Sequence, residues 1–570
     1  MGEYLSPGVY VEEIDNSARS IEGIGTSTAG FIGFAEKGPI IGAPVLVTGF
    51  ADFLTKFGGF LSEFEFGEYR YLANAVEQYF INGGTRCFVS RVAPADVVTA
   101  QAKLGELTIQ AANPGKWGNK IQANLSLVTK KKLQLVAKEG ETYTAKNISG
   151  FKEGDIVTNG KQYNVIESIF DGTVTFADPF EEEVVDSSLI PKKVLYLVET
   201  DVQIRYKDQI ETYSGLSFNQ ASPYFILNRM EKSNIVKVSL ENPNDGIANM
   251  ISIFGEEDNK AVVVLAGGTD GTLAKVNAGT FIGEDNGPGK RSGIQAFLEN
   301  NNVSIMAIPG ITIPEVVVAL VAHCEQLKNR FAVLDMPRDM TKTQDLIEYR
   351  GMIDSSYAAM YHPWVQVYDR GTGKAALVPP SGSVMGVYSR TDVQRGVHKA
   401  PANEQIVATG LAVNYTQAEQ DILNPEGINL IRILPGQGIR IWGARTASSN
   451  SNFKYVNVRR LFIFVEESIR ANTNWVVFEP NDQNLWGRVQ FSITTFLTDL
   501  WRAGMLAGAT PAEAFFVEIG TTTMSRDDIA NGKLICNIGI SPSKPAEFVV
   551  FRVTQHTAES GGGAAEAAEE

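Results

Sequence analysis

The sequence predicts a multidomain α/β protein with nested α/β domains, an all-β insertion and an extended arm at each end. Three observations predict this fold class. Apolar strand-like runs alternate with helical segments along most of the chain, which favours α/β domains. Residues 120–204 contain only short strands separated by Gly, Asn and Asp turns. Short β-competent runs stand at both ends, outside any domain-sized segment. At 570 residues, the chain is also too long for one compact core.

Residues 1–20 are predicted to form an N-terminal arm, because GVYVEEI is a lone β-like run between a Pro-Gly pair and the polar stretch DNSARS. In an extended strand Val9 and Val11 share one face, and Tyr10 and Glu12 share the other. A lone strand is not stable in water and needs the edge of a sheet. These four residues are therefore candidates for linking one subunit to another.

The next α/β domain is predicted to combine residues 21–119 with residues 205–345. TAGFIGFA and TRCFVSRV are typical of strands, and YRYLANAVEQYFING between them has helical spacing. AVVVLAGG, NVSIMAIPG and RFAVLDMP are apolar runs separated by helical stretches, which indicates a parallel sheet buried on both faces. Residues 346–545, with WVQVYD and IRILPGQGIRIWG as strands, are predicted to form a C-terminal α/β domain.

The insertion at 120–204 is predicted to be a small barrel or sandwich on the outer surface. Asn-Gly at 159–160 and Asp-Gly at 171–172 lie between β-rich runs, which is a hairpin signal. The basic run at 130–132 is interpreted as a solvated strand face, with a nucleic-acid patch as the alternative.

The C-terminal segment at 546–556, AEFVVFRVTQH, is predicted to be a second linking strand. It has apolar side chains on both faces, and Val549, Phe551 and Val553 share one of them. The candidate linking residues here are Phe548, Val549, Val550, Phe551 and Val553. Residues 557–570 form a small-residue acidic tail that is expected to be disordered.

Composition excludes several classes of function. The net charge of −15 argues against broad binding to nucleic acid or to an anionic membrane. Three distant cysteines, Cys87, Cys324 and Cys536, argue against a disulfide framework and favour a reducing compartment. We expect synthesis in the cytoplasm, because no signal peptide is visible and the longest apolar runs are too short to cross a bilayer.

No set of residues has the spacing of a catalytic, cofactor-binding or metal-binding site. GEDNGPGKRS at 283–292 resembles a phosphate-binding loop, but Arg291 stands where the magnesium-binding hydroxyl belongs. GTSTAG around Ser27 resembles the nucleophile segment of subtilisin-type proteases, but no histidine precedes His323. We therefore expect no enzyme activity and no cofactor, and we keep an α/β hydrolase as the disfavoured alternative.

Several long segments resemble the tail sheath proteins of contractile phages and of extracellular contractile injection systems. They are YLSPGVYVEEID with SIEGIGTSTAGFIGFAEKGP, PPSGSVMGVYSRTDVQRGVHKAPAN, NLIRILPGQGIRIWGARTAS and VNVRRLFIFVEESIRANTNWVVFEPND. The resemblance covers about 1–110 and 205–556, and the block at 120–204 matches nothing in the family.

The resemblance implies a subtilisin-like domain without catalytic residues and hexameric rings stacked helically around an inner tube. It implies a sheath that contracts to drive the tube through a target cell envelope, and arms from neighbours that complete a sheet in a third subunit. The implied partners are further copies of the chain, the inner tube, baseplate and terminal cap proteins, and paralogous sheath subunits, without nucleic acid and without membrane insertion. The particle would be assembled in a bacterial cytoplasm and would be a phage tail or a phage-tail-like particle, in some systems released from the cell.

Two alternatives stay open at this point. The terminal strands could pair within their own subunit instead of with a neighbour. The mixed charges in VRRLFIFVEESIRANTNWVVFEP could belong to an ordinary amphipathic helix or face the inner tube. The candidate tube-facing residues are Arg459, Arg460, Glu466, Glu467 and Arg470. A tail tube or baseplate protein is a further alternative, disfavoured by chain length and by the α/β pattern.

Overall fold

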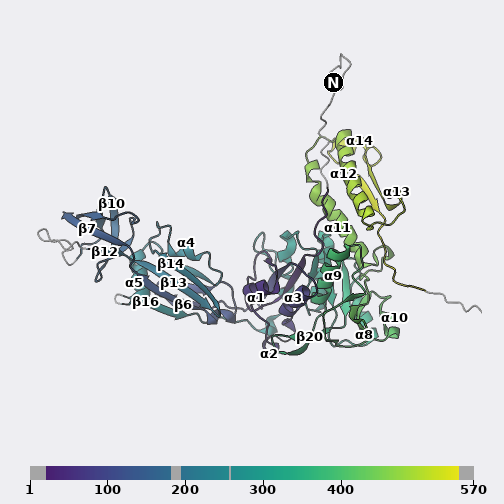
Figure 1. The fold of residues 1–570 in the computed structure, drawn as a ribbon, viewed down its shortest axis with the longest axis horizontal. Coiled ribbons are helices and arrows are strands. Elements are labelled where there is room, and N and C mark those ends of the chain that lie inside the picture. The colour runs from purple at the N-terminus through teal and green to yellow at the C-terminus, as the bar shows by residue number, and fades with distance from the viewer. Residues whose placement is uncertain (1–20, 181–193, 256–257, 551–570) are drawn as a thin grey trace, which may run out of the picture.

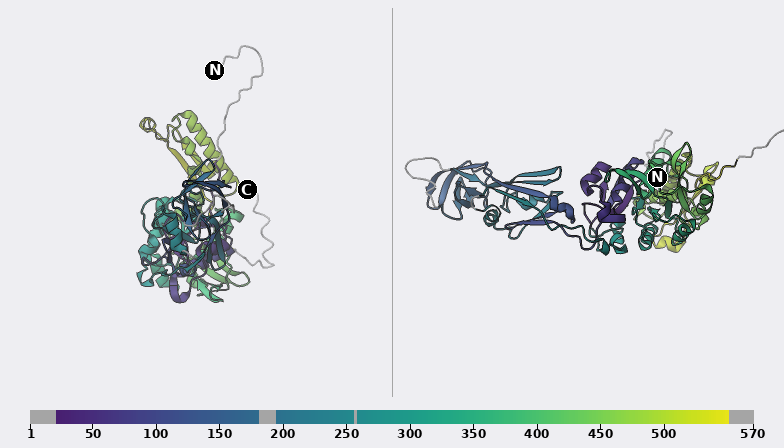
Figure 2. Two further views of the ribbon diagram at one scale, coloured as in Figure 1. Left: turned by 90° about the vertical axis from the view of Figure 1, so that its left-hand side faces the viewer. Right: turned by 90° about the horizontal axis from the view of Figure 1, so that it is seen from below.

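The computed structural model describes residues 21–180, 194–255 and 258–550. The molecule is elongated: a β-rich arm extends to one side of an α/β body, and a helical C-terminal part rises from the opposite end of that body (Figure 1). The right view of Figure 2 also separates the β-rich arm from the body. The predicted linking residues Val9–Glu12, Phe551 and Val553 and the acidic tail lie outside the described residues.

A nine-stranded sheet forms the α/β body. Its order is β2 (Val45–Val47), β3 (Cys87–Val92), β1 (Ala29–Phe34), β17 (Ile305–Ala307), β18 (Phe331–Asp335), β19 (Ala358–His362), β24 (Ile428–Leu434), β25 (Gly438–Ile441) and β22 (Glu404–Gln405). The six strands from β3 to β24 run parallel. Strands β1, β17, β18 and β19 are buried along their whole length, because helices cover both faces of the sheet.

Two apolar cores lie on the two faces of this sheet. One is formed with α1 (Phe50–Phe57), α3 (Leu72–Ile81) and α9 (Ser381–Arg395), and the other with α6 (Ala278–Ile282), α7 (Pro314–Leu327), α8 (Thr343–Arg350) and α10 (Gln417–Leu423). Helices α3 and α9 approach closely because Gly382 and Gly386 face the backbone of α3; a Cβ at Gly382 would lie 2.3 Å from the carbonyl oxygen of Ala75.

Shorter elements complete the body. They are α2 (Glu63–Phe66), a small sheet of β21 (Lys374–Val378), β20 (Val365–Asp369) and β23 (Gly410–Leu411), and the 3₁₀ turns η1 (Gly67–Tyr69), η3 (Leu273–Lys275) and η4 (Gln295–Glu299). None of the helices in the described ranges is long and apolar enough to cross a membrane.

The β-rich arm consists of two modules. The module next to the body has a sheet of β14 (Gln209–Leu216), β13 (Glu199–Tyr206), β6 (Gln122–Val128) and β16 (Lys260–Val264), and a sheet of β15 (Val236–Leu240), β5 (Leu107–Ala111) and β4 (Gln101–Leu104). With α4 (Ile226–Met230), α5 (Gly246–Phe254) and η2 (Lys116–Lys120) these strands enclose a core of their own. The arm joins the body beside an isolated bridge between Val98 and Thr269.

The outer module is a closed barrel, one of the two forms that the sequence left open. Its strands are β10 (Tyr163–Phe170), β11 (Thr173–Phe176), β8 (Thr142–Lys146), β7 (Lys132–Glu139), β12 (Val194–Leu197) and β9 (Ile156–Thr158), in barrel order. The predicted hairpins are present: Asn159-Gly160 joins β9 to β10, and Asp171-Gly172 joins β10 to β11 with positive φ at both residues.

The structure differs from two predicted boundaries. The β-rich insertion begins before 120 and ends after 204, because β5 pairs with β15 and β6 pairs with β16. The apolar run AVVVLAGG therefore contributes the antiparallel strand β16 and not a strand of the parallel sheet. No domain boundary follows residue 345, because β18 pairs in parallel with β19 and residues 346–447 complete the same sheet.

The C-terminal part contains α11 (Val456–Asn472), α12 (Gln483–Arg502), α13 (Pro511–Ala514), α14 (Arg526–Ala530), η5 (Ser451–Phe453) and η6 (Asn474–Val476). Strands β26 (Phe515–Ile519) and β27 (Cys536–Ile540) form a separate two-stranded sheet. The apolar core of the C-terminal part lies between α11, α12 and this sheet. It includes Ile21, the first described residue.

Candidate functional site: an open two-stranded sheet and the roots of the arms

The sheet of β26 and β27 is exposed at its edges. One of its faces packs on α12, where Phe515, Val517 and Ile519 are half-buried. Within the described part of the chain no other strand pairs with either outer edge. Two strands alone are marginally stable in water, and an unpaired edge presents backbone N–H and C=O groups to an incoming strand. The geometry therefore suits strand addition from outside the described chain.

The opposite face of this sheet carries Phe516, which is half exposed. Its ring lies over Gly539 on the paired strand; a Cβ at Gly539 would lie only 2.1 Å from Cε1 of Phe516. Because residue 539 is a glycine, the Phe516 ring can lie across the neighbouring strand β27. The side away from α12 therefore exposes one aromatic ring next to the polar pair of Glu518 and Asn537.

After β27 the chain stays attached to the loop that follows α12. The backbone N–H of Ala507 donates to the carbonyl of Ser541 at 2.8 Å, and the N–H of Ser543 donates to the carbonyl of Met505 at 3.3 Å. From residue 544 to 550 the chain has no regular secondary structure. The described half of the predicted C-terminal strand therefore does not pair within its own subunit.

Three of the predicted linking residues lie in this unpaired segment. Phe548, Val549 and Val550 are 75%, 67% and 78% exposed. Burying each of these three consecutive apolar side chains would contribute about 1.5–3 kcal/mol, so the segment is a candidate for contact with another chain.

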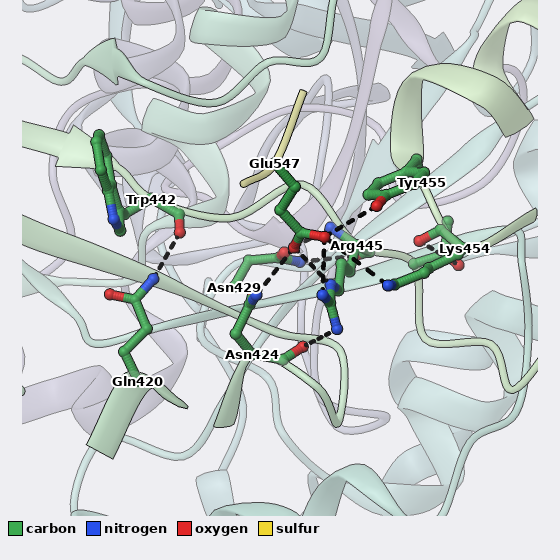
Figure 3. A network of polar contacts seen from close by, with 9 residues as sticks. Gln420, Asn424, Asn429, Trp442, Arg445, Lys454, Tyr455 and Glu547 are labelled. Atoms are coloured by element: carbon green, nitrogen blue, oxygen red, sulfur yellow. Dashed lines mark hydrogen bonds and ion pairs between the residues drawn. The ribbon is translucent and has the colours of Figure 1, made fainter. Parts of the chain in front are cut away.

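Glu547 fixes the start of this exposed segment to the body (Figure 3). The guanidinium of Arg445 donates to both carboxylate oxygens, from Nε at 2.7 Å and from Nη2 at 2.8 Å. Asn424 Nδ2 donates to Oε1 at 2.9 Å, and the Tyr455 hydroxyl donates to Oε2 at 2.9 Å. Lys454 Nζ lies 3.8 Å from Oε2. A bidentate arginine–carboxylate pair is strong and directional, so the position of Glu547 is well defined.

We call Glu547 with Arg445, Asn424 and Tyr455 the Glu547 clamp. Arg445 is itself held in place by neighbouring groups. Its side chain is 7% exposed, and Nη1 donates to the carbonyl of Asn424 at 3.0 Å. The Asn429 side chain bonds both backbone groups of Arg445, accepting from its N–H at 2.7 Å and donating to its carbonyl at 2.8 Å. Burial alone would raise the pKa of the Glu547 carboxyl, but the hydrogen bonds from Arg445, Asn424 and Tyr455 lower it to about 2. Glu547 is therefore ionised at neutral pH.

The residues that follow the N-terminal arm are held on α11. The backbone N–H of Ile24 donates to the Ser468 hydroxyl at 3.1 Å, and Asn472 Nδ2 donates to the carbonyl of Glu22 at 2.9 Å. Gly23 lies against the Phe464 ring; a Cβ there would lie 2.8 Å from Cζ. The chain is thus attached along this helix before it enters β1.

Two of the candidate tube-facing residues lie inside the subunit. Arg460 makes two hydrogen bonds to Asp392, and the side chains of this pair are 3% and 5% exposed. Its Nη2 also donates to the carbonyl of Thr26 at 2.9 Å. Arg459 lies with its guanidinium carbon 3.6 Å from the centroid of the Phe453 ring. Both arginines therefore already have partners within the chain, a role that the charge pattern alone did not reveal.

The other three candidates lie farther along α11. Glu467 is mostly buried and accepts two hydrogen bonds from Arg470, whose side chain is 57% exposed. Glu466 is exposed. Of the five candidates, Glu466 and Arg470 are accessible in the isolated subunit.

The motif residues considered in the sequence are not brought together as a catalytic set within the described ranges. The Ser27 carbonyl accepts hydrogen bonds from Tyr79 and Ser389. His323 is buried with Nε2 3.3 Å from Nη1 of Arg330, and burial and the arginine charge lower its pKa to about 3. In the described residues no group of three or more His, Cys, Asp or Glu side chains is placed to hold a metal ion.

Two family models match consecutive segments in the second half of the chain. The model of the phage tail sheath protein central domain matches residues 287–447, and the model of the phage tail sheath C-terminal domain matches residues 448–556. The boundary between them coincides with the structural step from the nine-stranded sheet to the helical C-terminal part.

Individual relatives agree with the family models. The chain is 29% identical to the tail sheath protein of Burkholderia phage BcepMu over 50% of this chain and 63% of that protein. It is 24% identical to the tail sheath protein of Escherichia phage P2 over 52% of this chain and 77% of that protein. The sheath complex of the extracellular contractile injection system PVC, solved in the contracted state, is similar in fold: the TM-score is 0.52 at 20% identity, covering 98% of this chain and all of that chain.

The fold, an α/β body with a β-rich arm and a separate helical C-terminal part, is thus that of a contractile sheath subunit. The chain belongs to the tail sheath proteins of contractile phages and contractile injection systems, and it is a structural subunit of such a sheath.

Proposed function

We propose that the chain assembles as hexameric rings, stacked helically around an inner tube, and that contraction of this lattice drives the tube through a target cell envelope. The observation that carries the proposal is the combination of a two-stranded sheet with unpaired edges and a separate extended segment with three exposed apolar residues. A subunit that donates a strand and accepts another makes a heterologous contact, which continues into rings or helices.

The linking residues follow from this arrangement. Residues Val9–Glu12 of one neighbour and Phe548–Val553 of another would add to the edges of β26 and β27. Main-chain hydrogen bonds supply affinity in such pairing, and alternate side chains supply specificity. About five net hydrogen bonds of roughly 1 kcal/mol each are modest for one junction, but repetition through a lattice makes the assembly hard to dissociate.

Further features of the proposal rest on the family resemblance. The body, with its parallel sheet covered by helices on both faces, would be the subtilisin-like domain without catalytic function. Glu466 and Arg470 on α11 are the accessible candidates for contact with the inner tube. Baseplate and terminal cap proteins would bind the ends of the lattice, and the subunit would be synthesised and assembled in a bacterial cytoplasm.

Truncation tests the strand exchange. A chain ending at Gln555 should still form full-length tubes, whereas a chain ending at Pro545 and a chain lacking residues 1–15 should remain folded monomers or small oligomers. Sedimentation of the three variants beside the intact chain measures assembly, and electron microscopy identifies the tubes. A chain ending at Pro545 that still sediments as intact sheath would refute strand exchange at the C-terminus.

A further inference from the structure

The segment before the exposed linking residues alternates between half-buried and exposed side chains. Ser543, Pro545 and Glu547 are half-buried, while Lys544 and Ala546 between them are exposed. This alternation has the period of two that an extended strand requires. The chain therefore leaves the body with its side-chain orientation already set.

Glu547 is the last point of attachment in this segment. Beyond it, no hydrogen bond or ion pair joins residues 548–550 to the rest of the described chain. Its carboxylate accepts four hydrogen bonds, from Arg445, Asn424 and Tyr455. Ser543, at the other end of the segment, makes three neutral hydrogen bonds, with Met505, Gly504 and Asn457, whereas Glu547 is held by an ion pair as well.

One part of the attachment is made at the start of α11, the helix that also holds the residues after the N-terminal arm. Tyr455, which binds Glu547, immediately precedes α11, and Asn457 Nδ2 in its first turn donates to the Ser543 carbonyl at 3.2 Å. The far end of α11 holds the N-terminal root through Ser468 and Asn472. Helix α11 therefore contacts the described chain at both places, Glu22 and Ile24 near its C-terminal end and Ser543 at its first turn, and its internal hydrogen bonds keep these two places at a fixed distance.

We propose that Glu547 is a positioning residue that sets the register of the C-terminal linking strand. With Glu547 clamped facing the body, Val549 faces the same way, and Phe548 and Val550 face the opposite way. Because the side-chain period of a strand is two, a shift of one residue exchanges the faces of every side chain that follows. The clamp would therefore determine which apolar residues meet the acceptor sheet. This inference rests on the proposed strand exchange.

The test uses insertions into the full-length chain between Glu547 and Phe548. One inserted serine exchanges the faces of the following strand, whereas two inserted serines restore them and add only about 7 Å of chain. We expect the single insertion to reduce sedimentable sheath by roughly tenfold or more and the double insertion to retain most of it. A single serine inserted after Glu559, beyond the linking strand, is the control and should have no effect.

A single insertion that assembles like the intact chain would overturn the register role, because the strand would then choose its own faces. Equal loss of assembly in both insertions would also overturn it, because chain length and not side-chain orientation would be decisive. Residues 548–550 make no polar contact with the body, so the insertions should leave the monomer folded, and urea unfolding verifies this.

Substitution of Glu547 distinguishes a register role from a purely structural role. Glu547→Ala should allow the single insertion to recover part of its assembly, because a released root can rotate and restore the preferred faces. If Glu547→Ala leaves the single insertion as defective as before, Glu547 does not set the register. The truncation at Pro545 tests strand exchange separately: a chain that needs residues 546–555 but tolerates the single insertion retains the proposed function and loses only this inference.

Discussion

The buried pair of Arg460 and Asp392 is expected to be among the most sensitive positions of the body. The guanidinium makes two hydrogen bonds to the carboxylate, at 2.9 Å and 2.5 Å. Thr26 contributes its hydroxyl to Asp392 at 2.7 Å and its carbonyl to Arg460 at 2.9 Å. The guanidinium also lies 4.7 Å from the centroid of the Tyr388 ring. The pair thus joins α9, α11 and the chain leading into β1.

Replacing Arg460 by alanine should destabilise the subunit by about 3–5 kcal/mol, because Asp392 would remain buried without its counter-charge. Only the Thr26 hydroxyl would still bind the carboxylate. The double change Arg460→Met with Asp392→Asn should cost clearly less, about 1–3 kcal/mol, because it removes both charges and retains most of the volume. The exposed pair of Arg488 and Glu479 is the matched control, since breaking it should cost at most about 1 kcal/mol.

Urea unfolding of the chain ending at Pro545, followed by tryptophan fluorescence, measures these differences without interference from assembly. Three tryptophans, Trp475, Trp486 and Trp501, lie in the C-terminal part and report on its unfolding. A loss below about 1 kcal/mol for Arg460→Ala would refute the buried-pair reasoning. If full-length Arg460→Ala then also failed to assemble, the residue would act at a contact between proteins, as the tube-facing hypothesis supposes.

Two other predictions concern the arm root and the barrel. The ordinary pKa of 4.5 falls to about 2 for the Glu547 carboxyl in the folded chain. Its stabilising contribution should therefore be complete above about pH 4.5 and be lost as the pH falls towards 2. The difference in unfolding free energy between the intact chain and Glu547→Gln should shrink over that range; a difference that grows on acidification would contradict the clamp. Replacing residues 129–198 by Asn-Gly should leave a folded subunit that still assembles, because Val128 and Glu199 are directly paired partners and a two-residue turn joins such strands. Soluble protein and sedimentable tubes are the measurements, and insoluble protein would show that the barrel supports its neighbour module.

The sequence predicted the type of most elements but not the boundary of the β-rich arm. The hairpins at Asn159-Gly160 and Asp171-Gly172 were predictable because these dipeptides favour φ > 0. The place of the apolar run at 260–264 could not be predicted in this way. A short run of valines suits a buried parallel strand and an antiparallel edge strand equally well. Its partner β6 is more than a hundred residues away, and only that pairing assigns it to the arm.

The exposed linking residues could be predicted from the sequence, but the contacts of Glu547, which anchors them, could not. Exposed apolar side chains at 548–550 follow from local pattern, since no polar residue interrupts the run FVVF. The local pattern does not single out Glu547, although it is the one carboxylate directly before that run. Its partners come from three separate places, with Arg445 102 residues away in sequence, and no local periodicity links them. The register role could be inferred only from the folded chain.

Helix α11 carries both buried and accessible charged residues. Its charge pattern allowed either an amphipathic helix on a core or a surface for the tube, and the structure divides the residues between two roles. Arg460 is used within the body, where it holds Thr26 and so the chain that follows the N-terminal arm. Glu466 and Arg470 remain accessible on the same helix. A force applied to the accessible side of α11 would therefore reach both arm roots through hydrogen bonds and ion pairs, without passing through the β-rich arm. Under the proposed strand exchange, such a helix would move with the lattice as one rigid element while the paired strands stay intact.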